Sequence, residues 1–503
     1  DHYIQVGEYL YAPTTLLPFS EGGRPQTKED LIALEFSLED AIDPAVDKRR
    51  ADGSYPPLSE ERKQELYDVA LRWWMVWARD ARAPRLSRLI VLSVPTGGAQ
   101  PVTQKPYPLP YAYLDAVRDE VQKLLDGGLI EPCISNWASP VLVRLKKDST
   151  PDKIRLKLIC DFRRLNEVSI EDAGSIGDQN EILDGFGGDQ RYAGICDAAG
   201  GFYQYLIHPN SRHKTAICLP TSMGGTTFQW VVAPYGLKRN PAGYSRGMMY
   251  ALKGLDHCSL DGDRAHGGTK SWIDDISMHA DSFDGFVDLF DRILGRMAYA
   301  SMSLKASKTF IMKPRLEVLG YFITPDGLVM QDDKLKDLRK YDAEGELVSP
   351  RNVQEIRTFM GAVQFYRRFV PRISLLAAPM NAMLKKMKQG DPRNRPGSKE
   401  HTEAYAEVRQ SFLAIMDFLN SSAVVAAPDL TDPLAEYVIC TDACDVSAGG
   451  ALLQWQYPGG YRARGKDKGL PPAGTPLRGG KASDPITSSW GAAAGWQLRT
   501  IAY

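Results

Sequence analysis

The sequence lacks long apolar runs and has almost no excess of charge of either sign. No stretch of about 18 apolar residues occurs, and no basic segment followed by an apolar one opens the chain, so neither a membrane span nor a secretory signal is predicted. The 61 Lys and Arg residues are balanced by 62 Asp and Glu, a formal net charge of −1. A basic field over the whole molecule is excluded, and any nucleic-acid-binding surface must be local.

Cysteine is also scarce, and it forms no regular pattern. The seven cysteines are odd in number and scattered, which favours buried, reduced thiols in a soluble, intracellular protein. His257, Cys258 and His266 lie close together, but their spacing matches no regular zinc site. The length of 503 residues and the hydrophobic content of 43 % predict three or four globular domains.

The N-terminal part of the chain is acidic and carries a tryptophan-rich helix. Residues 1–95 hold sixteen acidic and twelve basic side chains, a net charge of −4 that repels phosphate. Ser59 followed by two glutamates predicts a helix start, and Leu66, Ala70, Trp73 and Trp77 then recur at helical spacing. We expect this face to pack against the rest of the protein.

Two adjacent carboxylates, Asp274 and Asp275, stand in the short apolar run 271–276. Alone, such a pair is typical of a solvated hairpin tip. A third acid, Asp197, ends another apolar strand, and three converging carboxylates hold two divalent cations about 3.5–4 Å apart in enzymes that attack phosphorus. The working hypothesis is nucleotidyl transfer.

A basic hairpin precedes Asp197. Residues 139–148 and 154–166 read as two strands joined by a polar loop. Four basic residues lie on or beside this loop: Lys146, Lys147, Arg155 and Lys157. They form either a solvated cationic hairpin or a clamp for a triphosphate.

A series of short motifs now carries a resemblance. In chain order they begin at Trp137 (Trp-Ala-Ser-Pro-Val), Asp161 (Asp-Phe-Arg-Arg-Leu-Asn), Pro234 (Pro-Tyr-Gly-Leu), Trp272 (Trp-Ile-Asp-Asp) and Leu319 (Leu-Gly-Tyr). Their collinear order resembles the reverse transcriptase in the Pol polyprotein of gypsy-class long-terminal-repeat (LTR) retrotransposons, over roughly residues 95–456.

The resemblance implies an α+β fold: a right-hand polymerase of fingers, palm and thumb, with an antiparallel palm sheet. A connection segment and an incomplete RNase H-like α/β module follow. The implied parts are an acidic extension (1–100), fingers (101–195 and 208–230), palm (196–325 without 208–230), thumb (326–395), connection (396–435) and partial RNase H-like segment (436–503). Residues 331–395 carry fourteen basic against eight acidic side chains, a net charge of +6 that suits a phosphate backbone.

The resemblance also implies roles for individual residues. Asp197 and Asp274 would bind two Mg²⁺ ions, with Mn²⁺ as an alternative, and Asp275 would support the catalytic site. The implied nucleotide-binding residues are Lys146, Lys147, Arg155, Lys157, Phe202 and Gln204, with Phe202 as the steric gate against a ribose 2′-hydroxyl. The implied template and primer contacts are Asp161, Arg163, Pro234, Tyr235, Gly236, Trp272, Leu319 and Gly320.

The chain also departs from the family's pattern. Trp272 stands where the family usually has Tyr, and about ten extra residues, 259–269, precede the central acids. Asp442 resembles the first metal ligand of RNase H, yet no glutamate follows Glu436, so RNase H activity is predicted to be absent.

Two functions are carried forward. The first is an RNA-directed DNA polymerase of retrotransposon origin, which uses an RNA template, a DNA or RNA primer and deoxynucleoside triphosphates, in the cytoplasm or nucleus. The second is a non-catalytic, co-opted scaffold subunit of a ribonucleoprotein such as a ribosome, in an organelle, with protein partners on residues 1–95 and on the C-terminal remnant. Neither needs a membrane. The chain begins at Asp1, which suggests a piece of a longer precursor.

Overall fold

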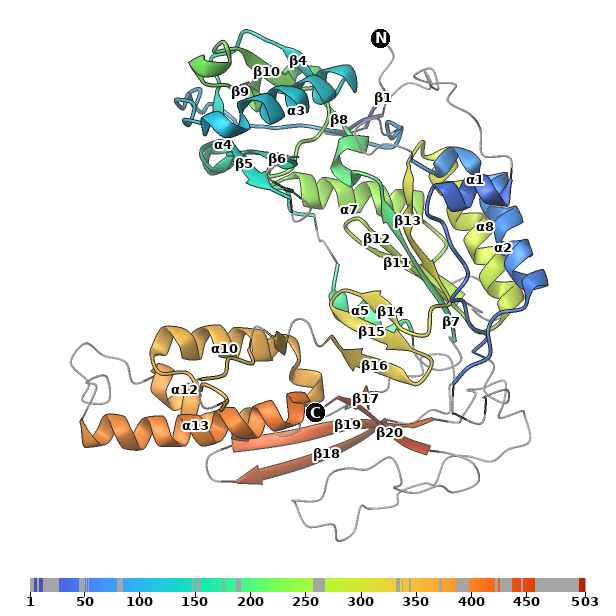
Figure 1. Cartoon of the computed structure of the whole chain (residues 1–503), viewed down its shortest axis with the longest axis vertical. Helices are drawn as coiled ribbons and strands as arrows, with labels where there is room; N and C mark the ends of the chain where they lie inside the picture. The colour runs from blue at the N-terminus through green and yellow to red at the C-terminus, as the bar shows by residue number, and fades with distance from the viewer. Residues whose placement is uncertain are drawn as a thin grey trace. The chain divides into compact units, whose positions relative to one another are not determined.

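The computed structural model describes much of the chain, in two compact units (Figure 1). The first unit comprises residues 1–41, 57–182 and 193–312, and the second 42–56, 183–192 and 313–503. The described residues are 4–6, 9–11, 27–44, 50, 52, 54–78, 85–146, 149–150, 154–174, 177–186, 191–256, 267–331, 335–336, 338–342, 345–370, 373–385, 398–420, 424–425, 437–444, 447–456 and 497–502. Helices and sheets are mixed in both units, which confirms the predicted α+β class.

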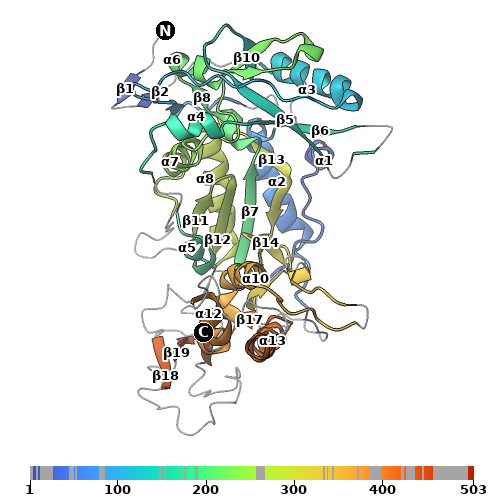
Figure 2. The ribbon, with the colours of Figure 1, turned by 90° about the vertical axis from the view of Figure 1, so that its left-hand side faces the viewer.

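A four-stranded sheet of the first unit, here called the palm sheet, has the strand order β11-β12-β7-β13. β11 and β12 form an antiparallel hairpin, and β13 runs antiparallel to β7. Helix α8 buries one apolar face against β11 and β12 (Figure 2). The bounds are Tyr192–Ala198 (β7), Gly267–Trp272 (β11), Asp275–Ala280 (β12), Phe283–Tyr299 (α8) and Leu304–Ile311 (β13).

A five-stranded sheet of the same unit, here called the fingers sheet, has the order β4-β10-β9-β5-β6. Its bounds are Ile130–Pro132 (β4), Ser139–Leu145 (β5), Leu156–Cys160 (β6), Ile217–Cys218 (β9) and Thr227–Trp230 (β10). The predicted basic hairpin is therefore present as β5 and β6, which pair antiparallel. Helix α3, Leu114–Asp126, ends at Gly127 and Gly128, and Gly128 has a φ of +66° that favours glycine.

Shorter elements complete the first unit. A small sheet joins β1 (Ile4–Val6), β2 (Tyr9–Tyr11), β3 (Val91–Leu92) and β8 (Leu206–Ile207). The remaining α-helices are α1 (Lys28–Ala33), α2 (Glu60–Arg72), α4 (Arg163–Val168), α6 (Pro209–Arg212) and α7 (Asn240–Ala251), and α5 (Gln179–Asp184) ends in the second unit. The 3₁₀ turns are Trp74–Val76, Tyr111–Tyr113, Gly201–Gln204, His213–Thr215 and Thr221–Met223.

The helix predicted after Ser59 packs internally, as expected, but it ends at Arg72, so the tryptophans follow it instead of lying on it. Ser59 caps α2 by accepting a hydrogen bond from the backbone N–H of Arg62, and Leu66 and Ala70 are fully buried. Trp77 is buried and donates from Nε1 to the carbonyl of Ala70 at 2.9 Å. Helix α2 packs on α8, so this part of the N-terminal extension is attached to the back of the palm sheet.

The second unit holds two further sheets and a group of helices. The first sheet is an antiparallel series, β14 (Leu316–Val318), β15 (Tyr321–Thr324), β16 (Gly327–Met330) and β17 (Val424–Val425). The second consists of β18 (Tyr437–Cys444), β19 (Ser447–Gln456) and β20 (Gln497–Ala502). The helices are α10 (Val353–Phe365), a 3₁₀ turn at Arg367–Phe369, α11 (Ile373–Leu376), α12 (Ala378–Lys385) and α13 (Lys399–Asn420).

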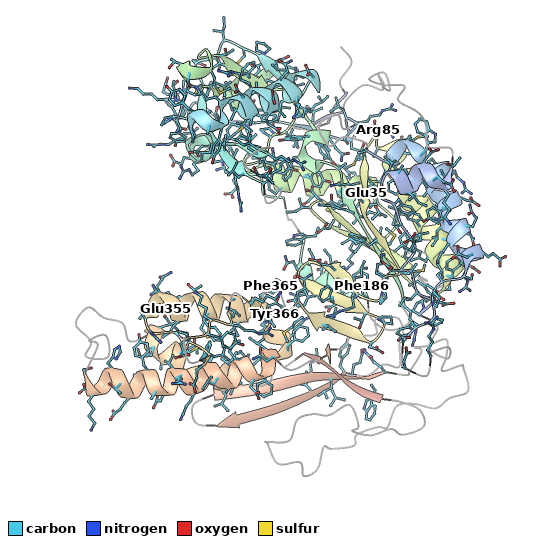
Figure 3. The ribbon with its side chains drawn as sticks, in the orientation of Figure 1. Glu35, Arg85, Phe186, Glu355, Phe365 and Tyr366 are labelled. Atoms are coloured by element: carbon cyan, nitrogen blue, oxygen red, sulfur yellow. The ribbon has the colours of Figure 1, made fainter. Side chains whose placement is uncertain are left out.

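Aromatic contacts attach α10 to the first of these sheets. The ring of Tyr321 stacks on that of Phe365 with centroids 5.0 Å apart, and its hydroxyl donates to the Phe365 carbonyl at 2.5 Å. Tyr366 packs edge-on against Tyr321 with centroids 5.7 Å apart; Figure 3 labels Phe365 and Tyr366 at the end of α10. This places the predicted primer-contact turn, Leu319 and Gly320, next to a rigid aromatic cluster.

Candidate active site

The three predicted catalytic carboxylates lie at one end of the palm sheet. Asp197 is the penultimate residue of β7, Asp275 is the first of β12, and Asp274 lies in the turn before it. The backbone N–H of Ala198 donates to the carbonyl of Asp274 at 2.8 Å. This bond holds Asp274 next to the end of β7, so Asp197 and Asp274 lie close together although they are 77 positions apart in the sequence.

The turn that presents Asp274 is strained. Trp272 pairs with Asp275, which leaves a two-residue hairpin loop of Ile273 and Asp274. Ile273 has a φ of +48°, in the left-handed region that a β-branched residue rarely adopts. Such turns favour a positive φ at this position, and an isoleucine there costs about 1–3 kcal/mol. This turn places Asp274 at the tip of the hairpin.

The side chain of Asp274 points at Gly201, the first residue of the 3₁₀ turn that follows β7. A Cβ atom on Gly201 would lie 1.9 Å from Oδ1 and 2.7 Å from Cγ of Asp274. Oδ1 is buried and has no hydrogen-bond partner among the described residues. The hydroxyl of Tyr244 also faces Gly201, is buried, and lies close enough to the Asp274 carboxylate to lower its pKa. Only glycine leaves room for this carboxylate.

Burial and neighbouring charge make Asp274 a weak acid. Burial first, and then the like charges of Asp197 and Asp275, raise the pKa of Asp274 to about 7. The ammonium group of Lys308, on β13, opposes this rise. Lys308 forms an ion pair with Asp197, with Nζ 2.8 Å from Oδ2. Among the described residues, the site therefore brings together three carboxylates and the ammonium group of Lys308.

The donor atoms of this site are of the kind that binds divalent cations. Carboxylate oxygens are the ligands that Mg²⁺ prefers, and the unpartnered Oδ1 of Asp274 is an acceptor that a cation would satisfy. Across the part of the chain that the structure describes, however, no three His, Cys, Asp or Glu side chains are already arranged to hold a metal ion. The donor types and charges fit, whereas the geometry requires Asp197 to exchange Lys308 for the metal.

Aromatic rings line the site beside the carboxylates. Phe202 is buried and packs edge-on against Tyr235 and Tyr244, with ring centroids 5.1 and 5.3 Å apart. Burial and the negative charges of Asp274 and Asp197 raise the pKa of Tyr235. The Nζ atom of Lys157 lies 4.4 Å from the centroid of the Tyr235 ring, a cation–π contact that brings β6 of the fingers sheet to this wall.

The predicted template residues Asp161 and Arg163 form a rigid pair at the start of α4. The carboxylate of Asp161 accepts from Nε of Arg163 at 2.8 Å and from Nη2 at 2.7 Å, and Tyr107 donates to it at 3.0 Å. The bonds from Arg163 hold the pKa of Asp161 well below its usual range. The Asp161 side chain is 4 % exposed while that of Arg163 is 80 % exposed, so the pair presents an oriented guanidinium group to solvent.

The Pro234-Tyr235-Gly236 segment is held against α4. Gly236 has a φ of +100°, and its carbonyl accepts a hydrogen bond from Asn166 at 2.7 Å. The carbonyl of Pro234 accepts from Asn240 at 2.6 Å. The segment is thus fixed between α4 and α7.

The basic hairpin presents several cations on one pair of strands. Lys157 and Arg155 are exposed on β6 or just before it, and Lys146 is half-buried after β5. Arg144 lies directly opposite Lys157 in the register of β5 and β6, and it is also exposed. The sequence analysis did not identify Arg144, because only the pairing register of β5 with β6 places it beside Lys157. Lys147 lies outside the described residues.

Gln204 does not fit its predicted role as a nucleotide contact. It is fully buried, its amide nitrogen donates to the carbonyls of Ala199 and Ser303 at 2.9 Å each, and its Oε1 accepts from the N–H of Ser303 at 2.7 Å. All of its bonds are used to join the end of β7 to the segment before β13. Gln204 is a structural residue, and its effect on the site is indirect.

The remaining residues that the sequence singled out are not part of the cluster of carboxylates. Leu319 and Gly320 form the turn between β14 and β15 in the second unit, with φ values of +50° and +86°. Asp442 lies in β18 opposite Gly449, and its side chain is outside the described set. The cluster His257, Cys258 and His266 also lies outside the described residues. Cys160, Cys196 and Cys218 are buried free thiols, as predicted.

The fold is that of a reverse transcriptase. The structure of the foamy viral protease-reverse transcriptase dRH in complex with double-stranded DNA aligns over 90 % of this chain and 68 % of its own, with a TM-score of 0.66 at 18 % identity. The foamy viral protease-reverse transcriptase with an RNA/DNA hybrid aligns over 88 % of this chain and 51 % of its own, with a TM-score of 0.63 at 17 % identity.

The sequence is related to the Pol polyproteins of gypsy-class and other LTR retrotransposons. It is 29 % identical over 366 residues to the Retrovirus-related Pol polyprotein from transposon 297 of Drosophila melanogaster, covering 72 % of this chain and 31 % of that protein. It is 25 % identical over 397 residues to the polyprotein from transposon gypsy of the same organism, covering 78 % and 36 %. The chain spans about a third of the length of these relatives. No protein-family model matches it.

None of the described helices is long and apolar enough to cross a lipid bilayer.

Proposed function

We propose that the chain is an RNA-directed DNA polymerase that adds deoxynucleotides to the 3′-hydroxyl of a primer. The observation that carries this proposal is the convergence of Asp197, Asp274 and Asp275 at one end of the palm sheet, where burial first and then the charges of Asp197 and Asp275 raise the pKa of Asp274. Carboxylates this close together repel one another, which is unfavourable unless a cationic ligand neutralises their charge. The names of the relatives and the nucleic-acid complexes of the fold neighbours support the same activity.

Asp197 and Asp274 would hold two Mg²⁺ ions, or Mn²⁺, with Asp275 adjacent. Bound there, the ions would lower the pKa of the attacking hydroxyl and neutralise the triphosphate. The chain's own residues do the positioning. Lys157 with Arg144, Lys146 and Arg155 faces the phosphates, and the Phe202 ring excludes a ribose 2′-hydroxyl.

The template would lie across the first unit from Arg163 to Gly236. The guanidinium of Arg163 is oriented by Asp161, and the Pro234 to Gly236 segment offers a backbone without a Cβ for close approach to a base pair. The alternative of a non-catalytic scaffold has no support in the comparisons, and it leaves the buried acidic site without a use.

Primer extension on poly(rA)/oligo(dT) tests the proposal. We expect incorporation by the native chain with Mg²⁺ or Mn²⁺ and a loss of at least about 100-fold in Asp274→Asn, the order seen when an electrostatic group is removed from a reaction centre. Asp288→Asn is the matched control, because Asp288 forms a partly exposed ion pair with Arg292 on α8. Equal rates for the two variants, or no incorporation by the native chain on several templates with either metal, would reject the proposal.

A further inference from the structure

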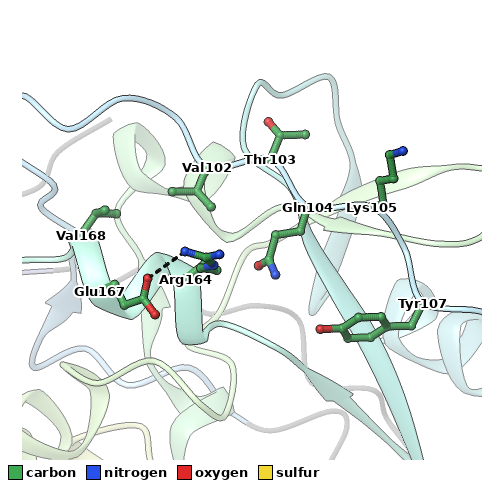
Figure 4. Close-up of a pocket in the computed structure, with 8 residues that line it drawn as sticks. All are labelled: Val102, Thr103, Gln104, Lys105, Tyr107, Arg164, Glu167 and Val168. Carbon is green, nitrogen blue, oxygen red and sulfur yellow. Dashed lines mark hydrogen bonds and ion pairs between the residues drawn. The ribbon is translucent and has the colours of Figure 1, made fainter.

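A hollow of about 690 Å³, here called the α8 pocket, lies on the exposed side of helix α8 in the first unit. It is separate from the hollow shown in Figure 4, which adjoins Asp161 through Tyr107 and so belongs with the template contacts proposed above. The α8 pocket is lined by aromatic, aliphatic and arginine side chains, of which the largest are those of Trp73, Met75, Leu255, Arg292, Arg296 and Tyr299.

The walls of the α8 pocket are held by contacts within the protein. The indole Nε1 of Trp73 donates to Asp291 at 2.9 Å, and the Trp73 ring lies against α8 at Gly295, where a Cβ would be 3.1 Å from the ring. The carbonyl of Leu255 accepts from the N–H of Thr269, in β11, at 2.9 Å. Because its walls are fixed in this way, the pocket is present without a ligand.

The pocket is formed on the side of α8 that the core does not use. Arg292, Arg296 and Tyr299 follow one another at helical spacing, and all three are exposed. Phe290 and Ile293, on the other side of the helix, are fully buried. Helix α8 packs on β11 and β12 (Figure 1), so these three exposed side chains are available to a partner.

The composition of the lining is that of a protein-binding surface. Interfaces between proteins are enriched in Trp, Tyr, Met and Arg and depleted in Lys, Asp, Glu and Ser, and Trp, Tyr and Arg supply most of the binding energy. The described residues that line the α8 pocket include each of the four enriched types and none of the four depleted ones. Tyr299 is 77 % exposed, so a partner that covers it removes a large aromatic surface from water.

The rim of the pocket carries positive charge that is available for binding. Arg296 is exposed and forms no ion pair with any residue that the structure describes. Arg292 pairs through Nε with Asp288 at 2.9 Å, and both side chains are partly exposed. One exposed acid, Asp256, follows Leu255 but is not among the lining residues. The rim therefore favours an anionic ligand.

Further cations adjoin the pocket, and their number is locally high. Nη1 of Arg85 donates to the carbonyl of Met75 at 3.2 Å, and burial and then the charge of nearby Arg88 lower the pKa of Arg85. Residues 72–88 hold five arginines and one aspartate, although residues 1–95 as a whole have a net charge of −4. The basic region is therefore small, and the acidic remainder repels a long polyanion.

A short acidic peptide fits this combination better than a nucleic acid does. Guanidinium groups bind carboxylates through two parallel hydrogen bonds, and a peptide can place such carboxylates beside a large apolar side chain. The pocket volume lies within the range of about 300–1,000 Å³ in which proteins enclose compact ligands. The thioether of Met75 and the side chain of Leu255 offer aliphatic surface, which suits an apolar side chain.

We propose that the α8 pocket binds a short acidic peptide segment of a partner protein. A large apolar or aromatic side chain of the peptide packs against Trp73 and Tyr299, and carboxylates that flank it pair with Arg292 and Arg296. The inference does not depend on the proposed function, because it needs neither a template nor a metal ion. The affinity falls as salt is added, because ion pairs at an exposed rim are screened.

Selection from a displayed library of short random peptides tests the proposal. The full native chain is the bait, and the peptide that is enriched most is synthesised with a fluorescent label and titrated by anisotropy. We expect the enriched peptides to combine Asp or Glu with Leu, Phe or Trp. Binding of the labelled peptide should weaken about 10-fold in Arg296→Glu and about 5- to 10-fold in Tyr299→Ser, as for a reversed rim charge and a truncated aromatic anchor.

Arg118→Glu and Tyr111→Ser are the matched controls, because both residues are exposed on the first unit and neither lines the α8 pocket. They should leave peptide binding unchanged, and thermal melting checks that all four variants fold. Enriched peptides without an acidic bias, no enriched peptide, or equal affinities of Arg296→Glu and Arg118→Glu would overturn the proposal. A single-stranded oligonucleotide that displaces the peptide and binds Arg296→Glu more weakly than the native chain would also overturn it, in favour of a nucleic-acid site.

Discussion

The ammonium group of Lys308 lies 2.8 Å from Oδ2 of Asp197, at the place where a divalent cation is expected. Lys308 is about half exposed and Asp197 is mostly buried, so the lysine can leave the carboxylate for solvent. In the metal-free protein it offsets part of the repulsion among the three acids. In the metal-bound protein it would have to give way.

We therefore expect Lys308→Met to bind divalent ions more tightly. Removing one partly solvated competing charge is worth about 1 kcal/mol, or roughly a fivefold lower apparent Kd for Mn²⁺. The measurement is the thermal shift of the protein as Mn²⁺ is added, which does not depend on turnover. Lys123→Met on α3 is the control. An unchanged or weaker affinity in Lys308→Met would show that the ion pair does not compete with the metal.

Gly201→Ala should inactivate the site without unfolding it. The new Cβ would lie 1.9 Å from Oδ1 of Asp274, and a side chain as short as aspartate can avoid it only by turning away. We expect primer extension to fall by at least about 100-fold, as for loss of the carboxylate itself. Gly98→Ala is the control, because a Cβ on Gly98 meets nothing within 4 Å and no positive φ is involved. Full activity in Gly201→Ala would mean that Asp274 does not act from this position.

The pKa of Asp274 predicts a pH dependence of stability. In the folded protein this pKa is about 7, against an ordinary value of 3.8. Between these values the folded state binds more protons than the unfolded state, so the Asp274 contribution to stability falls as the pH rises from about 4 to about 7 and is constant above. Metal binding needs the ionised carboxylate and should show the opposite trend.

The measurement is Tm against pH for native protein and Asp274→Asn, each with and without Mn²⁺. The difference in Tm, native minus variant, should decline through this window without metal. The shift caused by Mn²⁺ in the native protein should grow through it. Parallel curves for the two proteins would contradict the assigned pKa.

The sequence predicts the local elements and the acidic residues of this site better than it predicts their partners. Helix α2 follows from Ser59, from the two glutamates after it and from the helical spacing of Leu66 and Ala70. The ion pair of Lys308 with Asp197 joins residues 111 positions apart across strands whose register shifts between Lys305 and Phe310. No local pattern encodes such a shift.

Gln204 is a second residue whose partners the sequence does not predict. A motif places it beside the catalytic strand, but only the fold reveals that Ser303 uses both ends of its amide. The close approach of Asp274 to Gly201 is likewise not predictable from the sequence, in which Gly201 looks like an ordinary turn glycine. The division into fingers, palm, thumb and connection stays a prediction.

Phe202→Val should admit ribonucleotides. The Phe202 ring is held edge-on by Tyr235 and Tyr244, so a smaller residue opens space beside the sugar instead of letting the ring rotate. We expect incorporation of ribonucleotides relative to deoxynucleotides to rise about 10- to 100-fold, at a cost of about 2 kcal/mol in folding stability. Single-nucleotide extension with each substrate measures the ratio within one protein, which separates selectivity from loss of stability. A constant ratio would remove Phe202 from the gate.

Asp291 should anchor the N-terminal extension to the palm. Its Oδ1 accepts from Nε1 of Trp73 at 2.9 Å and pairs with Arg72 at 2.6 Å, and the Trp73 ring lies over Gly295. Asp291→Ala leaves the part-buried indole N–H without its acceptor, so we expect a loss of about 1–2 kcal/mol, seen as a lower midpoint of urea unfolding followed by tryptophan fluorescence. Asp288→Ala on the same helix removes only an ion pair to Arg292 within the helix and should cost about 0.3–0.5 kcal/mol. Equal shifts in the two variants would mean that the extension is held by apolar packing of α2 on α8 alone.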